Sequence, residues 1–156
     1  MQIIRPQKSS KPVESFEQIK FLARDLQVFL EGGKMHPAGV IDKTSIALHH
    51  SQVDPEPFNF FVIKRAVVKA KPNEIVVVVN PKILERSPEK DFVLEGCISF
   101  PFRPDKRVKR NRRVKVSYQI PDDKGELVTK EEWVEGLMAY VFQHECQHSH
   151  GQNIYQ

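Results

Sequence analysis

The segment 142–148 restricts the fold of this chain more than any other stretch. It contains a His-Glu-x-x-His pattern, formed by His144, Glu145 and His148. On an α-helix the two histidines would lie one turn apart on one face, where both imidazoles can bind the same metal ion beside a carboxylate. Because so short a motif also arises by chance, it needs a third ligand and a helix around it. We therefore predict a helix that carries a metal site on its inward face.

The expected helix has recognisable ends. Thr129 and Glu132 have the spacing of a capping box, and Val128 and Trp133 occupy the positions of a hydrophobic staple. These signals predict a helix that begins near Thr129 and stops at Gly151. The apolar positions that recur at helical spacing before the histidines are Trp133, Leu137, Tyr140 and Val141. Both histidines should therefore point inward.

The composition fits one globular domain over residues 1–156, since 40% of the residues are hydrophobic and 28% are charged. No long apolar run is present, so we expect no signal peptide and no membrane span, and a cytoplasmic location. Two cysteines, Cys97 and Cys146, are too few for a disulfide framework; in a reducing compartment they would be metal ligands or buried thiols. The net charge of +4 permits an anionic partner without requiring one.

The rest of the chain predicts one more helix and several strands. Residues 1–14 are polar and contain prolines, which favours an extended arm on the surface. Ser15 and Gln18 repeat the capping-box spacing before an amphipathic helix that ends at Gly32. Runs of β-branched and aromatic residues predict an antiparallel sheet over 58–63, 66–68, 75–81, 91–101 and 114–120. We therefore expect an α+β fold, with antiparallel sheets packed around the metal-ligand helix.

Two further features are open to more than one interpretation. The basic segment 106–115 raises nucleic acid as a partner, but no aromatic residues interleave with its charges. A solvated strand face is favoured, with proximity to ribosomal RNA as the alternative. His49 and His50 are adjacent and cannot share a helix face, so polar contacts or exposure are favoured over a direct metal role.

Three blocks of sequence together resemble the peptide deformylase family. Residues 95–99 read Glu-Gly-Cys-Ile-Ser, residues 143–148 read Gln-His-Glu-Cys-Gln-His, and Gln52 ends a shorter block upstream. The resemblance covers nearly the whole chain. It implies the deformylase fold and a metal-dependent hydrolase that removes the N-formyl group from the formyl-methionine of nascent polypeptides, releasing formate.

By position, the resemblance implies a complete catalytic set. The three metal ligands are Cys97, His144 and His148. They leave a fourth tetrahedral position for water around one divalent ion, which in this family is Fe²⁺ in the cell and can be Zn²⁺, Ni²⁺ or Co²⁺. Glu145 would be the acid and base, while the Gln52 side-chain amide and the Ile98 backbone N–H would hold the oxyanion.

The resemblance also implies a methionine pocket and several partners. The pocket positions are Ile46, Ala47, Val93, Gly96, Leu137, Tyr140 and Val141. Backbone near Ile46 and Ala47 would pair with the peptide as an added strand. Glu95 would form an ion pair with Arg110. We expect a monomer in the bacterial cytosol. Its partners would be formyl-methionyl peptides and the ribosome, with no membrane. The short chain resembles phage-encoded deformylases, so the cytosol of a phage-infected host is a further expectation.

The upstream block departs from the family pattern Gly-x-Gly-Leu-Ala-Ala-x-Gln. Ser45 and Ala47 replace glycines, and His49 and His50 replace alanines, so the approach of a substrate backbone could be hindered. Gln147 stands where the family usually has Asp, which would change the hydrogen bonds behind the ligands. Two alternatives follow: a different formyl or acyl amide substrate, or a catalytically impaired protein that binds peptides or the ribosome. A closed structural zinc site would need a fourth histidine ligand.

Overall fold

The structure is a computed structural model that describes residues 1–32, 34–35, 41–42, 46–64, 74–100 and 102–155. Its helical elements are η1 (Phe16–Gln18), α1 (Lys20–Gly32), η2 (His50–Gln52) and α2 (Leu137–Ser149). Its strands are β1 (Lys34–Met35), β2 (Ile41–Asp42), β3 (Ala47–His49), β4 (Phe60–Lys64), β5 (Ile75–Arg86), β6 (Lys90–Glu95), β7 (Lys106–Asn111), β8 (Arg113–Pro121) and β9 (Leu127–Glu135). The predicted strand 66–68 lies outside the described residues, as does Ser45.

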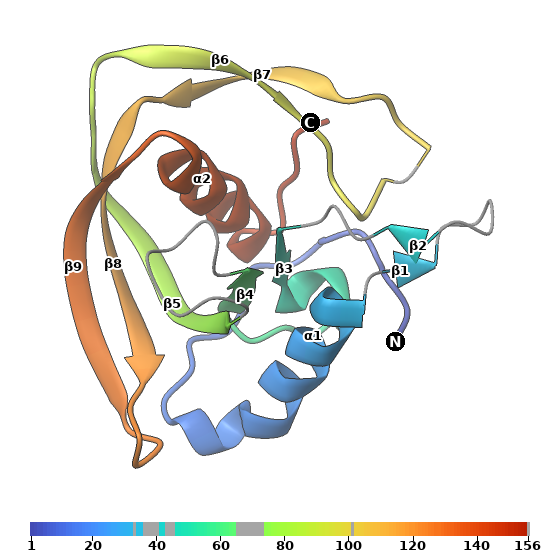
Figure 1. Cartoon of the computed structure of the whole chain (residues 1–156), viewed down its shortest axis with the longest axis vertical. Helices are drawn as coiled ribbons and strands as arrows, with labels where there is room; N and C mark the ends of the chain where they lie inside the picture. The colour runs from blue at the N-terminus through green and yellow to red at the C-terminus, as the bar shows by residue number, and fades with distance from the viewer. Residues whose placement is uncertain (33, 36–40, 43–45, 65–73, 101, 156) are drawn as a thin grey trace.

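A five-stranded antiparallel sheet in the order β3-β4-β5-β8-β9 forms the centre of the fold. The β1–β2 and β6–β7 pairs form two smaller antiparallel sheets. The long strands β5, β8 and β9 curve around α2, and the β6–β7 hairpin passes over the same helix (Figure 1). This arrangement confirms the predicted α+β fold, in which antiparallel sheets surround the helix of the histidine motif.

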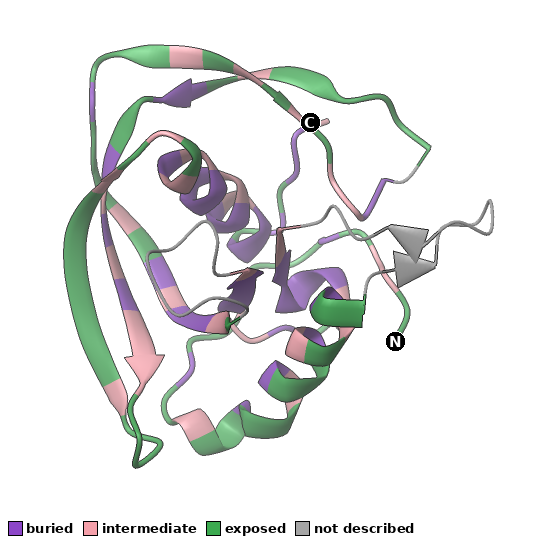
Figure 2. Ribbon diagram, viewed as in Figure 1, coloured by how far each residue is buried: buried purple, intermediate pink, exposed green. Residues whose placement is uncertain are grey.

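The sheet separates two hydrophobic clusters, because successive side chains of a strand point to opposite faces. Phe60 and Val62 of β4 pack in the cluster that contains α1, whereas Phe61 and Ile63 pack in the cluster that contains α2. Both faces are covered, which explains why 58–63 reads as a nearly continuous apolar run. Buried residues concentrate in α2, β3 and β4 (Figure 2). The motif helix is therefore fixed against the most buried part of the sheet.

The first helix is confirmed. The Gln18 side chain accepts a hydrogen bond from the Ser15 backbone N–H at 3.3 Å, as a capping box requires, but this box starts the short η1, and the α-helix itself begins at Lys20. The inward face of α1 carries Ala23, Leu26 and Leu30, all buried.

The predicted helix start at Thr129 is wrong. Residues Leu127–Glu135 form β9, which pairs with β8 without interruption from Pro121↔Leu127 to Arg113↔Glu135. The helix begins at Leu137, directly after Gly136, whose φ of 62° turns the chain out of the strand. A capping signal is a weak local preference, and the continuous ladder with β8 outweighs it. Trp133 therefore belongs to an exposed strand and not to the helix stripe.

The C-terminal end of α2 is as predicted, and the N-terminal arm packs against it. Gly151 follows the helix with a φ of 73°, and a Cβ there would lie 2.9 Å from backbone atoms of Gln7 and Lys8. The Ser10 backbone N–H donates to the Ser149 carbonyl at 2.8 Å. Residues 1–14 are extended as expected, but they brace the helix end and do not merely lie on the surface.

The basic segment is largely solvated, as the strand alternation predicted. Lys106, Arg107, Lys109 and Arg112 are exposed, whereas Arg110 is buried with 5% of its surface exposed. Among the described residues, no helix has the length and apolar character that crossing a membrane requires.

Candidate metal centre

Three side chains from two distant parts of the chain converge beside α2. His144 and His148 come from the helix, and Cys97 follows β6. The Nε2 atoms of the two histidines are 3.0 Å apart, and the Cys97 Sγ is 3.5 Å from His148 Nε2. The three ligand atoms all lie within 4.8 Å of one another. One sulfur and two ring nitrogens at this spacing can hold a single divalent metal ion.

The histidine rings are oriented for metal binding by their other nitrogens. His144 Nδ1 lies 2.8 Å from Glu95 Oε1, and His148 Nδ1 lies 2.9 Å from the Gln152 carbonyl oxygen. A carboxylate and a carbonyl only accept hydrogen bonds, so each Nδ1 carries the proton and each Nε2 can present a lone pair. Histidines that bind metals are fixed in this way. The donor set therefore fits a metal in its tautomers as well as in its spacing.

Glu95 is held by a buried arginine. Arg110 Nε donates to Glu95 Oε2 at 2.8 Å, and a terminal nitrogen of the same guanidinium donates to Oε1 at 2.7 Å, which confirms the expected ion pair. Burial raises the pKa of Glu95, but hydrogen bonds from Arg110 and His144 reverse this and lower it to about 2. Arg110 also donates to Gln147 Oε1 at 2.9 Å. Gln147 thus accepts from the arginine without adding a second negative charge.

Glu145 is buried beside this group and is incompletely paired. Its Oε2 has no hydrogen-bond partner among the described residues, although only 3% of the residue surface is exposed. The pKa of this carboxyl is raised to about 7, mainly by burial; the charge of His144 opposes the rise, and the charge of Glu95 adds to it. A buried polar atom without a partner is costly, so its presence indicates that a polar group from outside the chain belongs here. The site therefore fits a metal together with a reacting polar group.

The Gln52 amide is fixed close to the cysteine. The His49 backbone N–H donates to Gln52 Oε1 at 2.9 Å, which identifies the oxygen and directs Nε2 the other way. Gln52 Nε2 lies 3.0 Å from Ser99 Oγ and 3.6 Å from Cys97 Sγ. Ser99 Oγ in turn donates to the Ile4 carbonyl at 2.8 Å, and the Ile4 N–H donates to the Gln52 carbonyl at 2.7 Å. Sequence reasoning missed Ile4, because a backbone contact leaves no residue pattern.

His49 and His50 are not ligands in this arrangement. His49 Nδ1 lies 2.9 Å from Ser51 Oγ and its Nε2 lies 3.2 Å from Asn59 Oδ1. His50 Nδ1 accepts a hydrogen bond from the Phe58 backbone N–H at 2.9 Å. Of the two expected alternatives, polar contacts or exposure, the structure shows polar contacts, and both rings are buried. Among the described residues, neither histidine joins the group of three ligand atoms.

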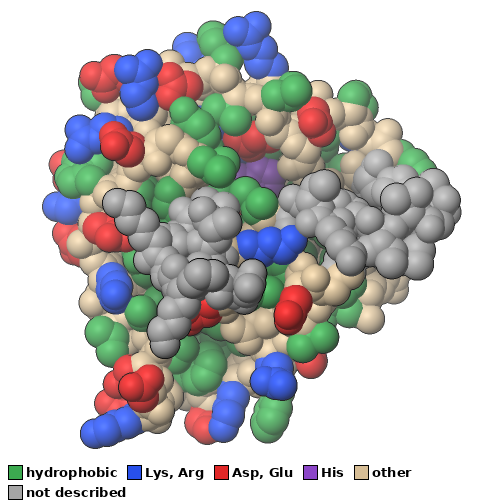
Figure 3. Space-filling view, in the orientation of Figure 1, with side chains coloured by type: hydrophobic (Ala, Val, Ile, Leu, Met, Phe, Trp, Pro, Cys, Tyr) green, Lys and Arg blue, Asp and Glu red, His purple; other side chains and the backbone are tan. Residues whose placement is uncertain are grey.

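The predicted pocket residues are only partly assembled. Ile46, Ala47 and Val141 pack in the same cluster beside α2. The Tyr140 hydroxyl donates to Asp91 Oδ2 at 2.6 Å, while Leu137 at the start of the helix is 54% exposed. From the side shown in Figure 3, a histidine is visible in a recess bordered by hydrophobic side chains.

Two backbone features suit an approaching peptide. β3 forms one edge of the five-stranded sheet, where an extended chain can add as a further strand. A Cβ at Gly96 would lie 2.6 Å from Asp105 Oδ1. Glycine at this position therefore lets the Asp105 carboxylate approach the backbone next to Cys97. Val93 is half-buried on β6, two residues before Glu95 in the sequence.

A sequence model of the polypeptide deformylase family matches residues 6–156. The chain belongs to this family. The peptide deformylase of Thermus thermophilus is 32% identical over 149 residues, which are 92% of this chain and 72% of that relative. The peptide deformylase of Thermotoga neapolitana is 49% identical over 79 residues, and that match spans 51% of this chain but only 45% of the relative.

Solved structures agree with this assignment. The crystal structure of peptide deformylase from Thermotoga maritima is similar with a TM-score of 0.77 and 33% identity, covering 99% of this chain and 94% of that one. A structure from Synechococcus phage S-SSM7 has a TM-score of 0.78 at 24% identity, covering 99% and 97%, and supports the fold alone. The resemblance seen in the three sequence blocks is thus confirmed.

Proposed function

We propose that this chain is a metal-dependent peptide deformylase, which hydrolyses the formyl amide at the N-terminal formyl-methionine of nascent polypeptides and releases formate. The observation that carries the proposal is the convergence of Cys97, His144 and His148 beside the unpaired Oε2 of Glu145. Three protein ligands leave a metal with an open position, and an adjacent carboxylate can move a proton. Membership of the polypeptide deformylase family supports the substrate class.

Cys97, His144 and His148 would hold one divalent ion. When bound, the metal would polarise the formyl carbonyl and supply a reactive water near neutral pH. One thiolate and two imidazoles suit Fe²⁺, Zn²⁺, Ni²⁺ and Co²⁺. We assign Fe²⁺ as the native ion on the family resemblance, and elemental analysis of protein purified without oxygen tests this choice.

Three further groups would act on the substrate. Glu145 would take a proton during attack and deliver it to the leaving amine. The Gln52 Nε2 and the Ile98 backbone N–H would donate to the oxygen of the formyl carbonyl as it becomes negative. The hydrogen bond from the His49 N–H to Gln52 Oε1 supports this role, because it prevents the amide from turning round.

The altered upstream block is compatible with turnover. The side chains of His49 and His50 are engaged by Ser51, Asn59 and the Phe58 N–H and are not directed at the three ligand atoms. We keep as the proposed methionine pocket the positions expected from the resemblance: Ile46, Ala47, Val93, Gly96, Leu137, Tyr140 and Val141. Substrate competition between formyl-methionyl peptides and other formyl amides tests its preference.

The partners follow from the same proposal. We expect a cytoplasmic monomer that meets its substrate on nascent chains, and the exposed Lys106, Arg107 and Lys109 of β7 offer a positive face to the ribosome. Co-sedimentation with ribosomes at low and high salt, together with the elution volume of the free protein, tests both statements.

The deciding experiment measures formate released from formyl-Met-Ala-Ser by metal-loaded protein purified without oxygen. The Glu145→Gln variant should lose about 10² to 10⁴ of the rate, as expected for loss of a general acid–base group, while retaining its metal. Glu135→Gln, which changes an exposed glutamate of β9, serves as the control and should keep full activity. Wild-type protein that holds one metal ion per chain yet releases no formate would favour the binding-protein alternative.

A further inference from the structure

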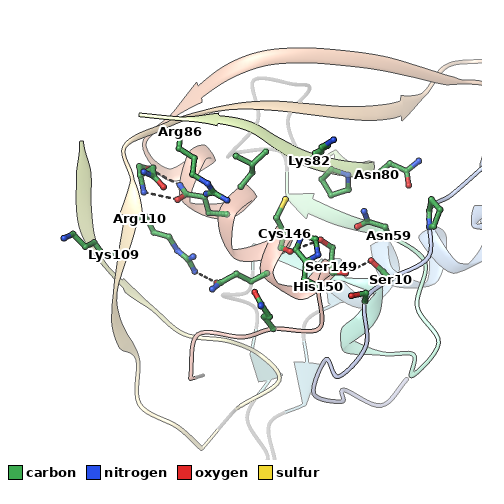
Figure 4. Close-up of a pocket in the computed structure, with 18 residues that line it drawn as sticks. Ser10, Asn59, Asn80, Lys82, Arg86, Lys109, Arg110, Cys146, Ser149 and His150 are labelled. Carbon is green, nitrogen blue, oxygen red and sulfur yellow. Dashed lines mark hydrogen bonds between the residues drawn. The ribbon is translucent and has the colours of Figure 1, made fainter. Parts of the chain in front are cut away.

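A cavity of about 710 Å³ lies on a different face of α2 from the two ligand histidines. Its walls come from β5, from β7, from the C-terminal half of α2 and from the N-terminal arm (Figure 4). The helix residues that line it include Gln143, Cys146 and Gln147, which alternate with the metal-site residues along the helix. The proposed deformylase reaction does not use this cavity.

The cavity has an excess of positive charge. Its cationic or basic lining residues are Lys82, Arg86, Lys109, Arg110 and His150. Among the described residues that line it, none is Asp or Glu. Arg110 is already paired with Glu95, but Lys82, Arg86 and Lys109 have no carboxylate partner within the described part of the chain. Among the described residues, Arg86 and Lys82 are therefore the cations beside the hollow that lack a counter-charge, because the Lys109 ammonium lies 5.8 Å from the centre of the Phe92 ring.

The arginine is placed to act inside the cavity. Arg86 extends from β5 toward the α2 side of the hollow, and Lys82 lies at its rim, whereas the Lys109 side chain points outward, away from the other labelled residues (Figure 4). The α2 side chains that line the cavity include Gln143, Cys146, Gln147 and Ser149, and none of these is a carboxylate. An anion that entered would meet a guanidinium before any negative group.

The C-terminal end of α2, which would otherwise repel an anion, is covered. The Ser149 carbonyl accepts two hydrogen bonds from Ser10, one from its backbone N–H at 2.8 Å and one from the Ser10 hydroxyl at 3.0 Å. The Cys146 carbonyl accepts from Ser149 Oγ at 2.7 Å, and the Gln147 carbonyl accepts from the Gln152 N–H at 2.8 Å. The remaining wall carries neutral side chains, namely Ser9, Asn59, Asn80, Asn111 and Gln143. The side-chain amides of Asn80, Asn111 and Gln143 are hydrogen-bonded within the protein.

We propose that this cavity binds a phosphate-bearing ligand, with Arg86 on the phosphate and Lys82 contributing charge at the rim. A guanidinium can donate two parallel hydrogen bonds to phosphate oxygens, which gives the ligand a defined place. The cavity is large enough for a mononucleotide, since ligand pockets start at roughly 300 Å³. A free nucleotide and a nucleic-acid strand both carry such a phosphate.

Isothermal titration of the metal-loaded protein with adenosine 5′-monophosphate, beside uncharged adenosine, tests the site. The nucleotide should bind, adenosine should not, and added salt should weaken binding because the interaction is with phosphate. The double variant Lys82→Gln with Arg86→Gln should bind at least tenfold more weakly. Arg24→Gln, on the exposed face of α1, removes a distant positive charge and should bind as the wild type does.

A competition arm separates this cavity from the metal centre, and an RNA arm separates the two sources of phosphate. Saturating formyl-Met-Ala-Ser, added to the metal-loaded Glu145→Gln variant so that the peptide is not consumed, should leave nucleotide binding unchanged; displacement would place the nucleotide at the metal and overturn the proposal. Absence of binding, or equal binding by the double variant, would also overturn it. A six-nucleotide adenylate RNA that binds more tightly than the mononucleotide identifies a strand as the ligand, whereas no gain identifies a free nucleotide.

Discussion

The protein contains two pairs of neighbouring histidines, and the ring nitrogens of the two pairs make different contacts. In the pair His144 and His148, each Nδ1 is bonded to an oxygen and the two Nε2 atoms face each other at 3.0 Å. In the pair His49 and His50, both ring nitrogens of His49 meet protein side chains, and His50 Nδ1 accepts a backbone N–H.

The difference lies in spacing and in available lone pairs, not in burial. Residues four apart on a helix share one face, so their rings can converge on a single point. Adjacent residues at the junction of β3 and η2 send their rings toward different partners, which use their hydrogen-bonding capacity. A buried histidine is therefore a candidate ligand when one nitrogen is fixed by an acceptor and the other remains available.

Removing one ring from each pair should produce the largest contrast. His148→Ala should lose its metal, with an affinity loss beyond the roughly 10- to 100-fold seen when only an outer hydrogen-bond partner is removed. His49→Ala should retain about one metal ion per folded chain, because its ring contacts Ser51 and Asn59. Metal content of the purified variants measures this, and equal loss in both would contradict the distinction.

Breaking the support behind His144 tests whether Glu95 must be paired. Arg110→Met leaves a buried carboxylate without its cation and should lower the free energy of unfolding by about 3 to 5 kcal/mol. Arg112→Met breaks an exposed pair with Asp91 and should cost at most about 1 kcal/mol. Urea unfolding of the two metal-loaded variants compares them directly. Similar losses would show that Glu95 does not depend on its arginine.

Lowering the pH should reduce the stability of the folded protein through the buried His49. Burial lowers the pKa of His49 from 6.5 to about 3, so the folded protein binds fewer protons than the unfolded chain between these values. This contribution to stability is complete above pH 6.5 and is lost as the pH falls, at about 1.4 kcal/mol per pH unit. Between pH 6.5 and 5 the loss would be about 2 kcal/mol. Unfolding midpoints of wild type and His49→Asn, measured across this range, should diverge, and parallel curves would argue against a neutral buried ring.

The smallest effect is expected where the two pairs are linked. Ser51 Oγ lies 2.9 Å from His49 Nδ1 and donates to the His148 carbonyl at 3.2 Å. Ser51→Ala should reduce stability by about 1 kcal/mol, the usual net value of a hydrogen bond, and leave the metal content unchanged. Thermal unfolding and metal analysis of the same sample would detect either effect. Metal loss here would mean that the second pair controls the first.

The comparison also shows which parts of the site could be predicted. The His-Glu-x-x-His spacing and the block around Cys97 are local patterns. They predicted the group of Cys97, His144 and His148, which the structure brings together, and the position of Glu145 beside it. The ion pair between Glu95 and Arg110 was also expected from position. The orientation of the Gln52 side chain was not predicted. It depends on a hydrogen bond from the His49 backbone, and the Gln52 backbone is held by Ile4, which is distant in the sequence.

The sequence by itself determined the elements with strong periodicity, because side-chain period and packing face are properties of neighbouring residues. It thereby predicted α1, the β4 and β5 runs and the helical histidine pair. Only the tertiary structure decided that residues 127–135 form a strand, since the ladder that outweighs their capping signal belongs to β8. The same holds for the burial of His49 and His50 and for the basic cavity behind α2. Their partners come from distant segments, and contact between such segments is fixed by the packing of the whole chain.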